Sequence, residues 1–285
     1  MFMVSKIGLP TKLYRATKSA LVLSLAHLRS SGKPWETLAI RAEKVFIPLR
    51  DELARKFSAN NSESRIFDNK YFAVPIYEGT LSTVFAAKPL KEGYLVIIKT
   101  GNELFEHLIE LETEALKKLA SPNTVKLLGA REGENPYIVL EFIPGCTLSD
   151  LIKTKDLTRA EANYLIDAML RIAHNLHAAG ITHNDFNPNN FMIDLNGDVK
   201  VVDFGICSIK FESEDKRNQK IQVDLLMLAG IINKILEQLP SHPAKALVRE
   251  VVNGAITART PFASALDFLT AINRMSSIFP PAIRG

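Results

Sequence analysis

Cysteine is nearly absent from this sequence, and its two cysteines, Cys146 and Cys207, lie 61 residues apart. That separation fits neither a metal-binding nor a redox motif, so a reducing compartment such as the cytoplasm is expected. The six histidines follow no metal-ligand spacing, and the sequence therefore predicts no zinc site. Long apolar runs are also lacking, because no segment reaches the run of about 18 residues that a membrane-spanning helix needs.

The composition is otherwise that of an ordinary globular protein, with 47% hydrophobic and 23% charged residues. A chain of 285 residues can form two modest domains or one two-lobed domain. Its charge is uneven: residues 1–70 hold 13 Lys and Arg against 6 Asp and Glu, and residues 71–285 hold 22 against 25. Such a basic front attracts acidic partners such as an anionic membrane face, although more often it is solvated surface. Nucleic acid is not expected as a partner.

The basic front is predicted to be helical. Leucines on one stripe indicate a helix over residues 12–29, and a second helix is expected to begin at Pro34, which suits a first helical turn. No small-residue cleavage site follows the first helix, so no signal peptide is expected. The polar segment 58–64 indicates a linker.

From residue 71 onward the pattern changes to strands and then to helices. β-Branched and aromatic residues predict strands first, and helical periodicity dominates later. The expected strands are 71–78, 81–88, 95–99, 124–130 and 136–142, with a helix at 102–120. After residue 158 the chain is mainly helical, beginning with a capping box at Thr158 and Glu161 and a helix end at Gly180.

The most informative stretch lies between residues 183 and 205. Residues 183–190 are HNDFNPNN and fit the pattern H-x-D-x-x-x-x-N, and residues 203–205 are DFG. Asp185 and Asp203 are 18 residues apart, and two short apolar stretches around a turn at 196–198 predict a β-hairpin between them. Phosphoryl transfer needs a carboxylate at the attacking hydroxyl and oxygen ligands for a hard cation, and these motifs supply both.

Both motifs at this spacing resemble the protein-kinase-like superfamily. In that family the loop aspartate orients the substrate hydroxyl, while the loop asparagine and the D-F-G aspartate bind magnesium. Asp185, Asn190 and Asp203 match those three positions. The resemblance therefore implies ATP and Mg²⁺ as cofactors.

The resemblance also implies an α+β, bilobal kinase-like fold. It places a small antiparallel β-rich N-lobe at 71–143 and a helical C-lobe at 144–285, behind a helical extension at 1–70. Only 45 residues follow Pro240, so the C-lobe is expected to be shortened.

Lys99 ends a predicted strand where the family uses a lysine on the ATP phosphates, and this lysine needs a carboxylate partner. Glu112 and Glu114 compete for that role. Glu112 has apolar neighbours at i−4, i+3 and i+4, whereas Glu114 has charged ones at the same spacings. Glu112 is therefore the predicted partner.

The glycine-rich loop of the family is degraded in this chain. Gly79 and Val84 match the pattern G-x-G-x-x-G-x-V, but Tyr77 and Ser82 replace two of its glycines. Glycine lets backbone N–H groups approach phosphate closely, and Ser82 is small enough to serve in the same place. Gly79, Ser82 and Val84 are the predicted phosphate-side residues.

Residues 137–145 resemble the connector between the two lobes. The end of a strand exposes backbone groups that pair with adenine, and Leu140 would line the back of that pocket. Leu140, Glu141 and Ile143 complete the predicted nucleotide site.

Several departures from the family pattern concern the substrate and its regulation. Asn184 replaces the arginine that meets a phosphorylated activation loop, so no such phosphorylation should be needed. Asn187 replaces the lysine typical of serine/threonine kinases. His183 and Asn184 before the aspartate also resemble aminoglycoside and choline kinases, and asparagine at 187 occurs in minimal kinase effectors of bacterial pathogens.

After Gly205 no A-P-E motif appears. The segment 206–220 contains a charge run that predicts solvated surface, and residues 223–232 predict a buried helix. Asp224 in that helix needs a partner, and the resemblance assigns it the backbone N–H groups of the catalytic loop.

The leading hypothesis is an ATP- and magnesium-dependent bacterial kinase of the eukaryotic-like Ser/Thr type, without the loop arginine, acting on a protein hydroxyl. The first alternative is a kinase for a small molecule, for example a lipopolysaccharide-core sugar or another sugar or lipid acceptor, working near a membrane. The second is a catalytically silent binding module, because the glycine loop is damaged. A cytoplasmic protein, peripheral at a membrane through residues 1–70, is expected, with a secreted effector as the alternative.

Overall fold

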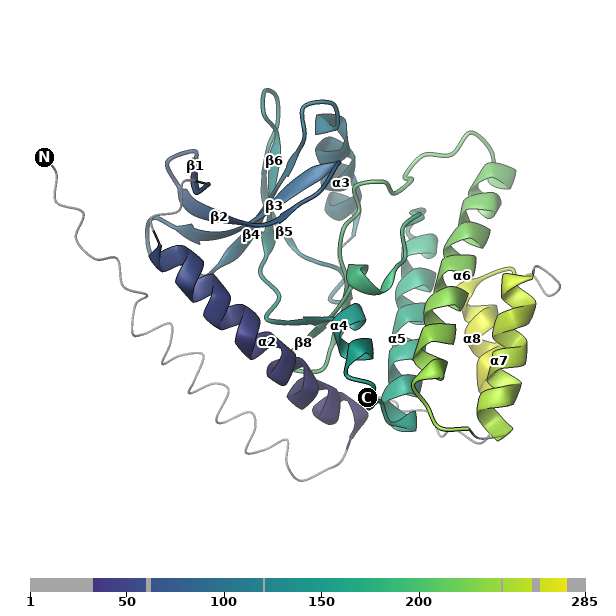
Figure 1. Cartoon of the computed structure of the whole chain (residues 1–285). Helices are drawn as coiled ribbons and strands as arrows, with labels where there is room; N and C mark the ends of the chain where they lie inside the picture. The colour runs from purple at the N-terminus through teal and green to yellow at the C-terminus, as the bar shows by residue number, and fades with distance from the viewer. Residues whose placement is uncertain (1–32, 60–62, 120, 242, 258–261, 276–285) are drawn as a thin grey trace, which may run out of the picture.

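The computed structural model describes residues 33–59, 63–119, 121–241, 243–257 and 262–275. The helix predicted over 12–29 lies outside these residues. The described chain forms one lobe dominated by a β-sheet and a second dominated by helices (Figure 1). This arrangement confirms the α+β, two-lobed fold that the motifs implied.

The first lobe is a six-stranded antiparallel sheet in the order β1-β2-β3-β4-β6-β5. Side chains alternate between its faces, so Phe85, Ile98 and Val139 from three neighbouring strands share one buried cluster. Helix α3 follows β4 and carries Glu112. The elements are β1 (Arg65–Phe67), β2 (Tyr71–Glu78), β3 (Ser82–Pro89), β4 (Val96–Gly101), α3 (Glu106–Lys118), β5 (Leu127–Arg131) and β6 (Tyr137–Glu141).

The second lobe combines a three-stranded sheet, in the order β7-β8-β9, with five helices in the described part of the chain. The predicted hairpin before the D-F-G motif is present as β8 and β9, and Gly197 turns it with φ at +79°. The elements are β7 (Gly145–Thr147), α4 (Leu148–Lys153), α5 (Arg159–Ala178), the 3₁₀ turn η1 (Pro188–Asn190), β8 (Phe191–Asp194), β9 (Val199–Val201), α6 (Glu214–Glu237), α7 (Pro243–Ile256) and α8 (Ala265–Met275).

The predicted start of α5 is confirmed in detail. The Thr158 hydroxyl accepts a hydrogen bond from the Glu161 N–H, and the Glu161 carboxylate accepts one from the Thr158 N–H. This capping box satisfies two backbone donors at once. Gly180, with φ at +73°, ends the helical segment.

Two helix boundaries differ from the sequence prediction. Helix α3 begins at Glu106 rather than at 102, because the Phe105 N–H bonds the Asn102 carbonyl in a turn. Helix α6 begins at Glu214, capped by the Ser213 side chain, rather than at 223. The charge run is largely exposed, as predicted, and most of it forms the first turn of α6, where Glu214 and Asp215 suit a helix N-terminus.

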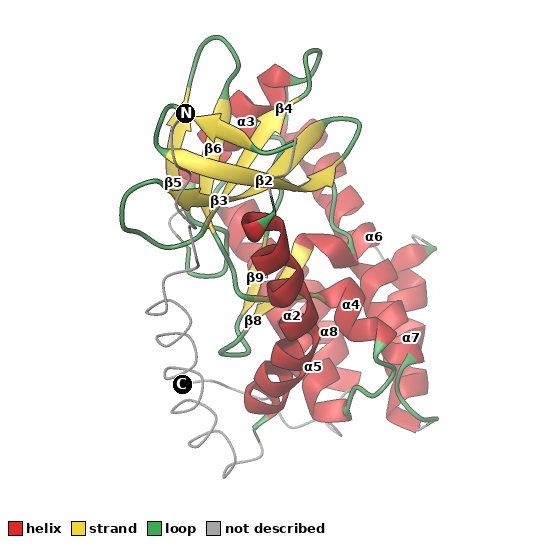
Figure 2. Ribbon diagram, turned by 60° about the vertical axis from the view of Figure 1, so that its left-hand side comes forward, coloured by secondary structure: helices red, strands yellow, loops and turns green. Residues whose placement is uncertain are grey.

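Helix α2 (Pro34–Ser58) contacts both lobes, running along the helical lobe and up to the sheet (Figures 1 and 2). Leu38 belongs to the core of the helical lobe, and Leu53 packs with Val74 and Ala86 of the sheet. Arg41 adds a hydrogen bond from Nε to the buried Glu161 carboxylate at 2.8 Å. Helix α2 thus belongs to the cores of both lobes.

Candidate active site

Lys99 joins the two lobes at the centre of the site. Its Nζ lies 2.7 Å from Glu112 Oε2 on α3 and 2.6 Å from Asp203 Oδ1 of the D-F-G motif. The lysine side chain is 7% exposed and that of Glu112 is fully buried, whereas 45% of the Asp203 side chain is exposed. One buried ammonium is therefore shared by a structural carboxylate and an accessible one.

Electrostatics keep both Lys99 and Asp203 charged. Burial would lower the pKa of Lys99, but the carboxylates of Glu112 and Asp203 outweigh it and hold that pKa above its ordinary value. Burial would raise the pKa of Asp203, but Lys99 and the Gly205 N–H outweigh it and hold that pKa below the usual range. Asp203 is thus an ionised carboxylate at neutral pH.

The choice between the two glutamates is decided by geometry. Glu112 holds Lys99 with Oε2 and accepts the Phe204 N–H with Oε1 at 3.1 Å. Complete burial raises the pKa of Glu112 against the attraction of Lys99. Glu114 lies on the exposed side of α3 and pairs with Lys118 and Lys210 instead. The apolar stripe on α3 therefore identified the buried partner correctly.

The predicted catalytic loop brings Asp185 and Asn190 into direct contact. Asn190 Nδ2 donates to the Asp185 carbonyl and to Asp185 Oδ2, each at 2.9 Å. The Asn190 carbonyl in turn accepts the Val202 N–H at 2.9 Å, one residue before Asp203. Hydrogen bonds thus link the loop to the D-F-G motif.

His183, for which the sequence predicted no role, links the catalytic loop to Val202 through its two ring nitrogens. Its Nδ1 accepts the Asp185 N–H at 3.3 Å, so Nε2 carries the proton and donates to the Val202 carbonyl at 3.2 Å. Burial lowers the pKa of His183, which favours this neutral form. The ring stacks on Phe186 and contacts Phe204, so the histidine is part of the support for Asp185.

Asp224 occupies the structural position that the resemblance assigned to it. Its Oδ2 accepts the His183 N–H at 2.9 Å, and its Oδ1 accepts the Asn184 N–H at 2.8 Å. His177 adds a contact from Nε2 at 2.8 Å. This fully buried carboxylate is therefore satisfied by the catalytic loop and α5.

Asn184 connects the catalytic loop to the segment after the D-F-G motif. Its Nδ2 donates to the Ile206 carbonyl at 2.8 Å and to the Ser208 hydroxyl at 2.9 Å, while Oδ1 accepts the Thr182 hydroxyl. Its φ is +64°, a conformation that asparagine tolerates better than most residues. The neutral amide of Asn184 thus ties the catalytic loop to residues 206 and 208.

The predicted phosphate loop, residues 79–82, forms the tight turn between β2 and β3. The Gly79 N–H bonds the Ser82 carbonyl at 2.9 Å, and Val84 stands opposite Lys99 across the sheet. A Cβ atom on Gly79 would lie 2.7 Å from the Tyr77 ring, so a larger residue at position 79 would require this exposed ring to move. The degraded loop therefore keeps a defined shape.

The predicted connector residues are Leu140 and Glu141, at the end of β6, and Ile143, which precedes β7. Leu140 and Ile143 are buried, and the Ile143 N–H has no partner among the described residues. The Glu141 side chain pairs with Lys200 of β9 at 2.6 Å and accepts the Lys126 N–H. The Glu141 side chain therefore joins the lobes and is not directed to a ligand.

The oxygen donors of the site fit a magnesium ion. Asp203 uses Oδ1 for Lys99 and Gly205, which leaves Oδ2 without a partner in the described structure. Asn190 directs Nδ2 to Asp185, so its Oδ1 remains to coordinate a cation. No cluster of three or more acidic, histidine or cysteine side chains suited to a metal occurs in the described chain. Two oxygen ligands match Mg²⁺, which keeps waters and substrate phosphates in its shell.

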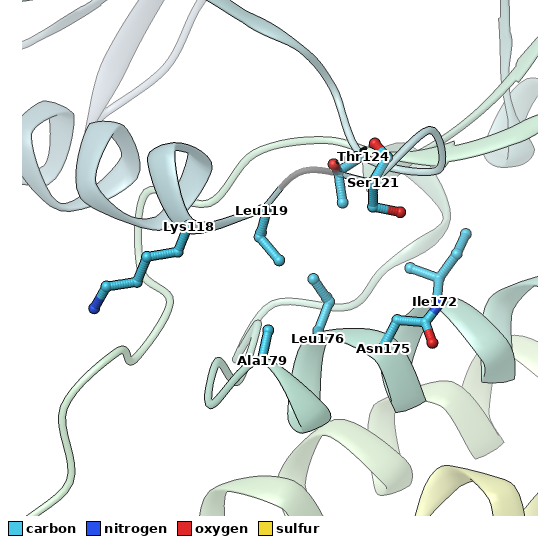
Figure 3. A pocket seen from close by; sticks show the side chains of 8 residues that line it. All are labelled: Lys118, Leu119, Ser121, Thr124, Ile172, Asn175, Leu176 and Ala179. Atoms are coloured by element: carbon cyan, nitrogen blue, oxygen red, sulfur yellow. Dashed lines mark hydrogen bonds between the residues drawn. The ribbon is translucent and has the colours of Figure 1, made fainter.

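A separate pocket of about 180 Å³ lies between the end of α3 and helix α5 (Figure 3). It contains none of the predicted site residues. Its lining is mixed, with the apolar residues Leu119, Ile172, Leu176 and Ala179 and the polar residues Lys118, Ser121, Thr124 and Asn175. The candidate active site is therefore distinct from this pocket.

Helices in the described ranges are all too short or too polar to cross a bilayer.

A β-sheet lobe and a helical lobe that bring Lys99, Glu112 and Asp203 together define a protein of the kinase class. The model of the protein kinase domain matches residues 73–227, more than half of the chain. The chain therefore belongs to the protein kinase family.

Individual relatives are distant. A probable serine/threonine-protein kinase of Clostridium perfringens is 34% identical over 155 residues, covering 50% of this chain and 22% of the relative. The serine/threonine-protein kinase DBF20 of Saccharomyces cerevisiae is 31% identical, covering 52% and 28%. Mitogen-activated protein kinase 19 of Arabidopsis thaliana is 30% identical, covering 50% and 26%. The chain thus spans about a quarter of the length of these curated relatives.

Proposed function

We propose that this protein is an ATP- and magnesium-dependent kinase that transfers the γ-phosphate to a serine or threonine hydroxyl of a protein. The observation that carries the proposal is the contact of the Lys99 ammonium with both Glu112 and Asp203. An inactive arrangement would separate these groups, since the lysine must be held while the aspartate stays accessible.

Each residue has a chemical task in this proposal. Lys99 neutralises phosphate charge and is held in place by Glu112. Asp203 and Asn190 are the magnesium ligands, and the ion supplies charge stabilisation on the transferred phosphate. Asp185, oriented through Asn190 and His183, accepts the hydrogen bond of the attacking hydroxyl. Leu140 and the Ile143 N–H receive the adenine ring.

The substrate class rests on the relatives, which are named as serine/threonine-protein kinases. Asn184 and Asn187 favour the second candidate, a small-molecule or sugar kinase, because they depart from the protein-kinase pattern. The replaced glycines favour the third, a nucleotide-binding module without turnover. The filled positions of Lys99, Asp185 and Asp203 support catalysis over that third candidate.

Within the kinases, we propose that the protein is a bacterial enzyme of the eukaryotic-like type that lacks the loop arginine and has a shortened C-lobe. We also propose a division between the two lobes at residue 144 and an anionic membrane face as a partner of the basic residues 1–70, of which α2 and β1 pack with the two lobes. A cytoplasmic location accompanies this assignment.

The test uses the full chain with γ-labelled ATP, magnesium, and separate protein and sugar or lipid extracts. Label on protein, abolished in Asp185→Ala and retained in the exposed Asp215→Ala control, supports the leading proposal. Label confined to the sugar or lipid extract overturns it in favour of the second candidate. Magnesium-ATP that raises the unfolding midpoint without any label transfer identifies the silent module.

A further inference from the structure

We infer that Asn102 is a positioning residue that fixes the backbone conformation of the phosphate loop, residues 79–82. It does so in a loop that lacks two of the family's glycines. The inference rests on the proposed function, since it concerns how the loop receives the ATP phosphates. Asn102 follows β4 and belongs to no motif of the family. Its contacts with residues 79–82 carry the inference.

Asn102 binds three consecutive carbonyl groups of the loop. Its Nδ2 donates to the carbonyls of Gly79 at 2.9 Å and Thr80 at 2.7 Å, and its backbone N–H donates to that of Leu81 at 3.0 Å. Carbonyl oxygens only accept, so the side-chain nitrogen must face the loop. The Thr83 hydroxyl reaches Oδ1 at 3.4 Å and supports the same orientation.

The held carbonyls fix the direction of the next three N–H groups. Across a trans peptide bond the C=O of one residue and the N–H of the next point in opposite directions. The N–H groups of Thr80, Leu81 and Ser82 therefore all point away from Asn102. The N–H groups of Thr80 and Leu81, which lie between the strands, have no partner in the described structure. Successive N–H groups aimed to one side form an anion-binding concavity.

This arrangement explains how the loop works without its other glycines. Glycine serves such loops by adopting positive φ, yet none of the residues 77–83 has a positive φ. Tyr77 and Ser82 can therefore adopt the backbone conformation of this loop. The side chain of Asn102 then holds the loop in that conformation. The Asn102 carbonyl also accepts the Phe105 N–H at 2.6 Å, which ties the loop to the turn before α3.

The test compares Asn102→Ala with Asn253→Ala, an exposed asparagine on α7. We expect Asn102→Ala to raise the Kd and KM for magnesium-ATP about tenfold, the effect of losing two hydrogen bonds, while kcat changes less than about threefold. A general structural defect would lower kcat as well. Asn253→Ala should leave both constants unchanged.

Amide exchange of the free protein provides a readout that needs no nucleotide. The Gly79 N–H, bonded to Ser82, should exchange at least about tenfold faster in Asn102→Ala, whereas the Val139 N–H in the central sheet should not change. Equal exchange and equal Kd in both proteins overturn the inference and leave the proposed function intact. A wild-type protein that binds no magnesium-ATP overturns the proposed function and the phosphate role together, and Gly79 exchange then decides whether Asn102 still holds the loop.

Discussion

The backbone carbonyl of Trp35 lies where a Cβ atom on Gly197 would stand, so the start of α2 and the β8–β9 turn are in direct contact. Trp35 and Gly197 are 162 positions apart in the chain. Glycine is therefore needed at position 197 for two reasons, its positive φ and the close approach of the Trp35 carbonyl.

Substituting Gly197 tests whether α2 is firmly attached. Gly133 is a matched control, because it also has positive φ, at +88°, but nothing within 4 Å of its Cβ position. We expect Gly133→Ala to lower the free energy of unfolding by about 1 kcal/mol through backbone strain at positive φ, and Gly197→Ala by about 3 kcal/mol, since overpacking is added to that strain. Urea unfolding measures both. Equal losses would mean that α2 does not hold the turn.

Glu112 and Glu114 are two positions apart but differ in their expected importance. Glu112→Gln should lower kcat/KM about 10- to 100-fold, because a hydrogen bond to a charged group contributes about 1.5–3 kcal/mol. Glu114→Gln on the exposed side of α3 should stay within about twofold of wild type. Steady-state kinetics at saturating and limiting ATP give the comparison. Similar losses in both variants would contradict the assignment of Glu112.

The neutral His183 predicts a dependence of stability on pH. Its lowered pKa means that the folded protein binds fewer protons at this site than the unfolded chain. The contribution of His183 to the free energy of unfolding is therefore complete above the unfolded pKa of about 6.5, and it decreases as the pH falls below that value. Urea unfolding at pH 7.5 and 5.5 should show this loss in wild type and less of it in His183→Gln. The exposed His107→Gln should behave as wild type, and an identical slope in all three proteins would refute the prediction.

Asn184 predicts activity without phosphorylation of the segment that follows the D-F-G motif. Treating the protein with a phosphatase should leave its kinase activity unchanged, because an amide, not a phosphate, makes the connection. Asn184→Gly keeps the positive φ but removes the side-chain bonds, and should lower kcat about tenfold through roughly 1–2 kcal/mol of lost hydrogen bonding. Asn184→Ala should lose about 1 kcal/mol more than Asn184→Gly, because alanine is strained at the positive φ of this position. Loss of activity on phosphatase treatment would show that the loop depends on phosphate after all.

Local patterns in the sequence predicted the parts of the structure that local chemistry determines. The capping box at Thr158 and the inward stripe of Glu112 follow from helical spacing alone. The order of sheet and helices followed from strand and helix periodicity. Asp224 was identified because a carboxylate in an apolar helix must find donors.

Contacts between distant segments were not predictable in this way. Nothing in the pattern of α2 indicates that Leu38 and Leu53 serve two different cores. The sequence pattern placed Asn102 at the start of a helix, whereas its contacts are with the β2–β3 turn more than twenty residues earlier. The short elements β7, with three residues, and α4, with six, were missed because fewer than two full periods of the strand or helix pattern fit within them.

Because α2 contributes to both cores, a stable fragment of this chain must include α2. A truncated protein that began at residue 73, where the family match starts, would lose Leu38 and Leu53 and expose Val74, Ala86 and Phe142 to water. It would also leave the Glu161 carboxylate without Arg41 in an apolar interior. The autonomous folding unit of this kinase therefore extends upstream of the conserved domain to at least Pro34.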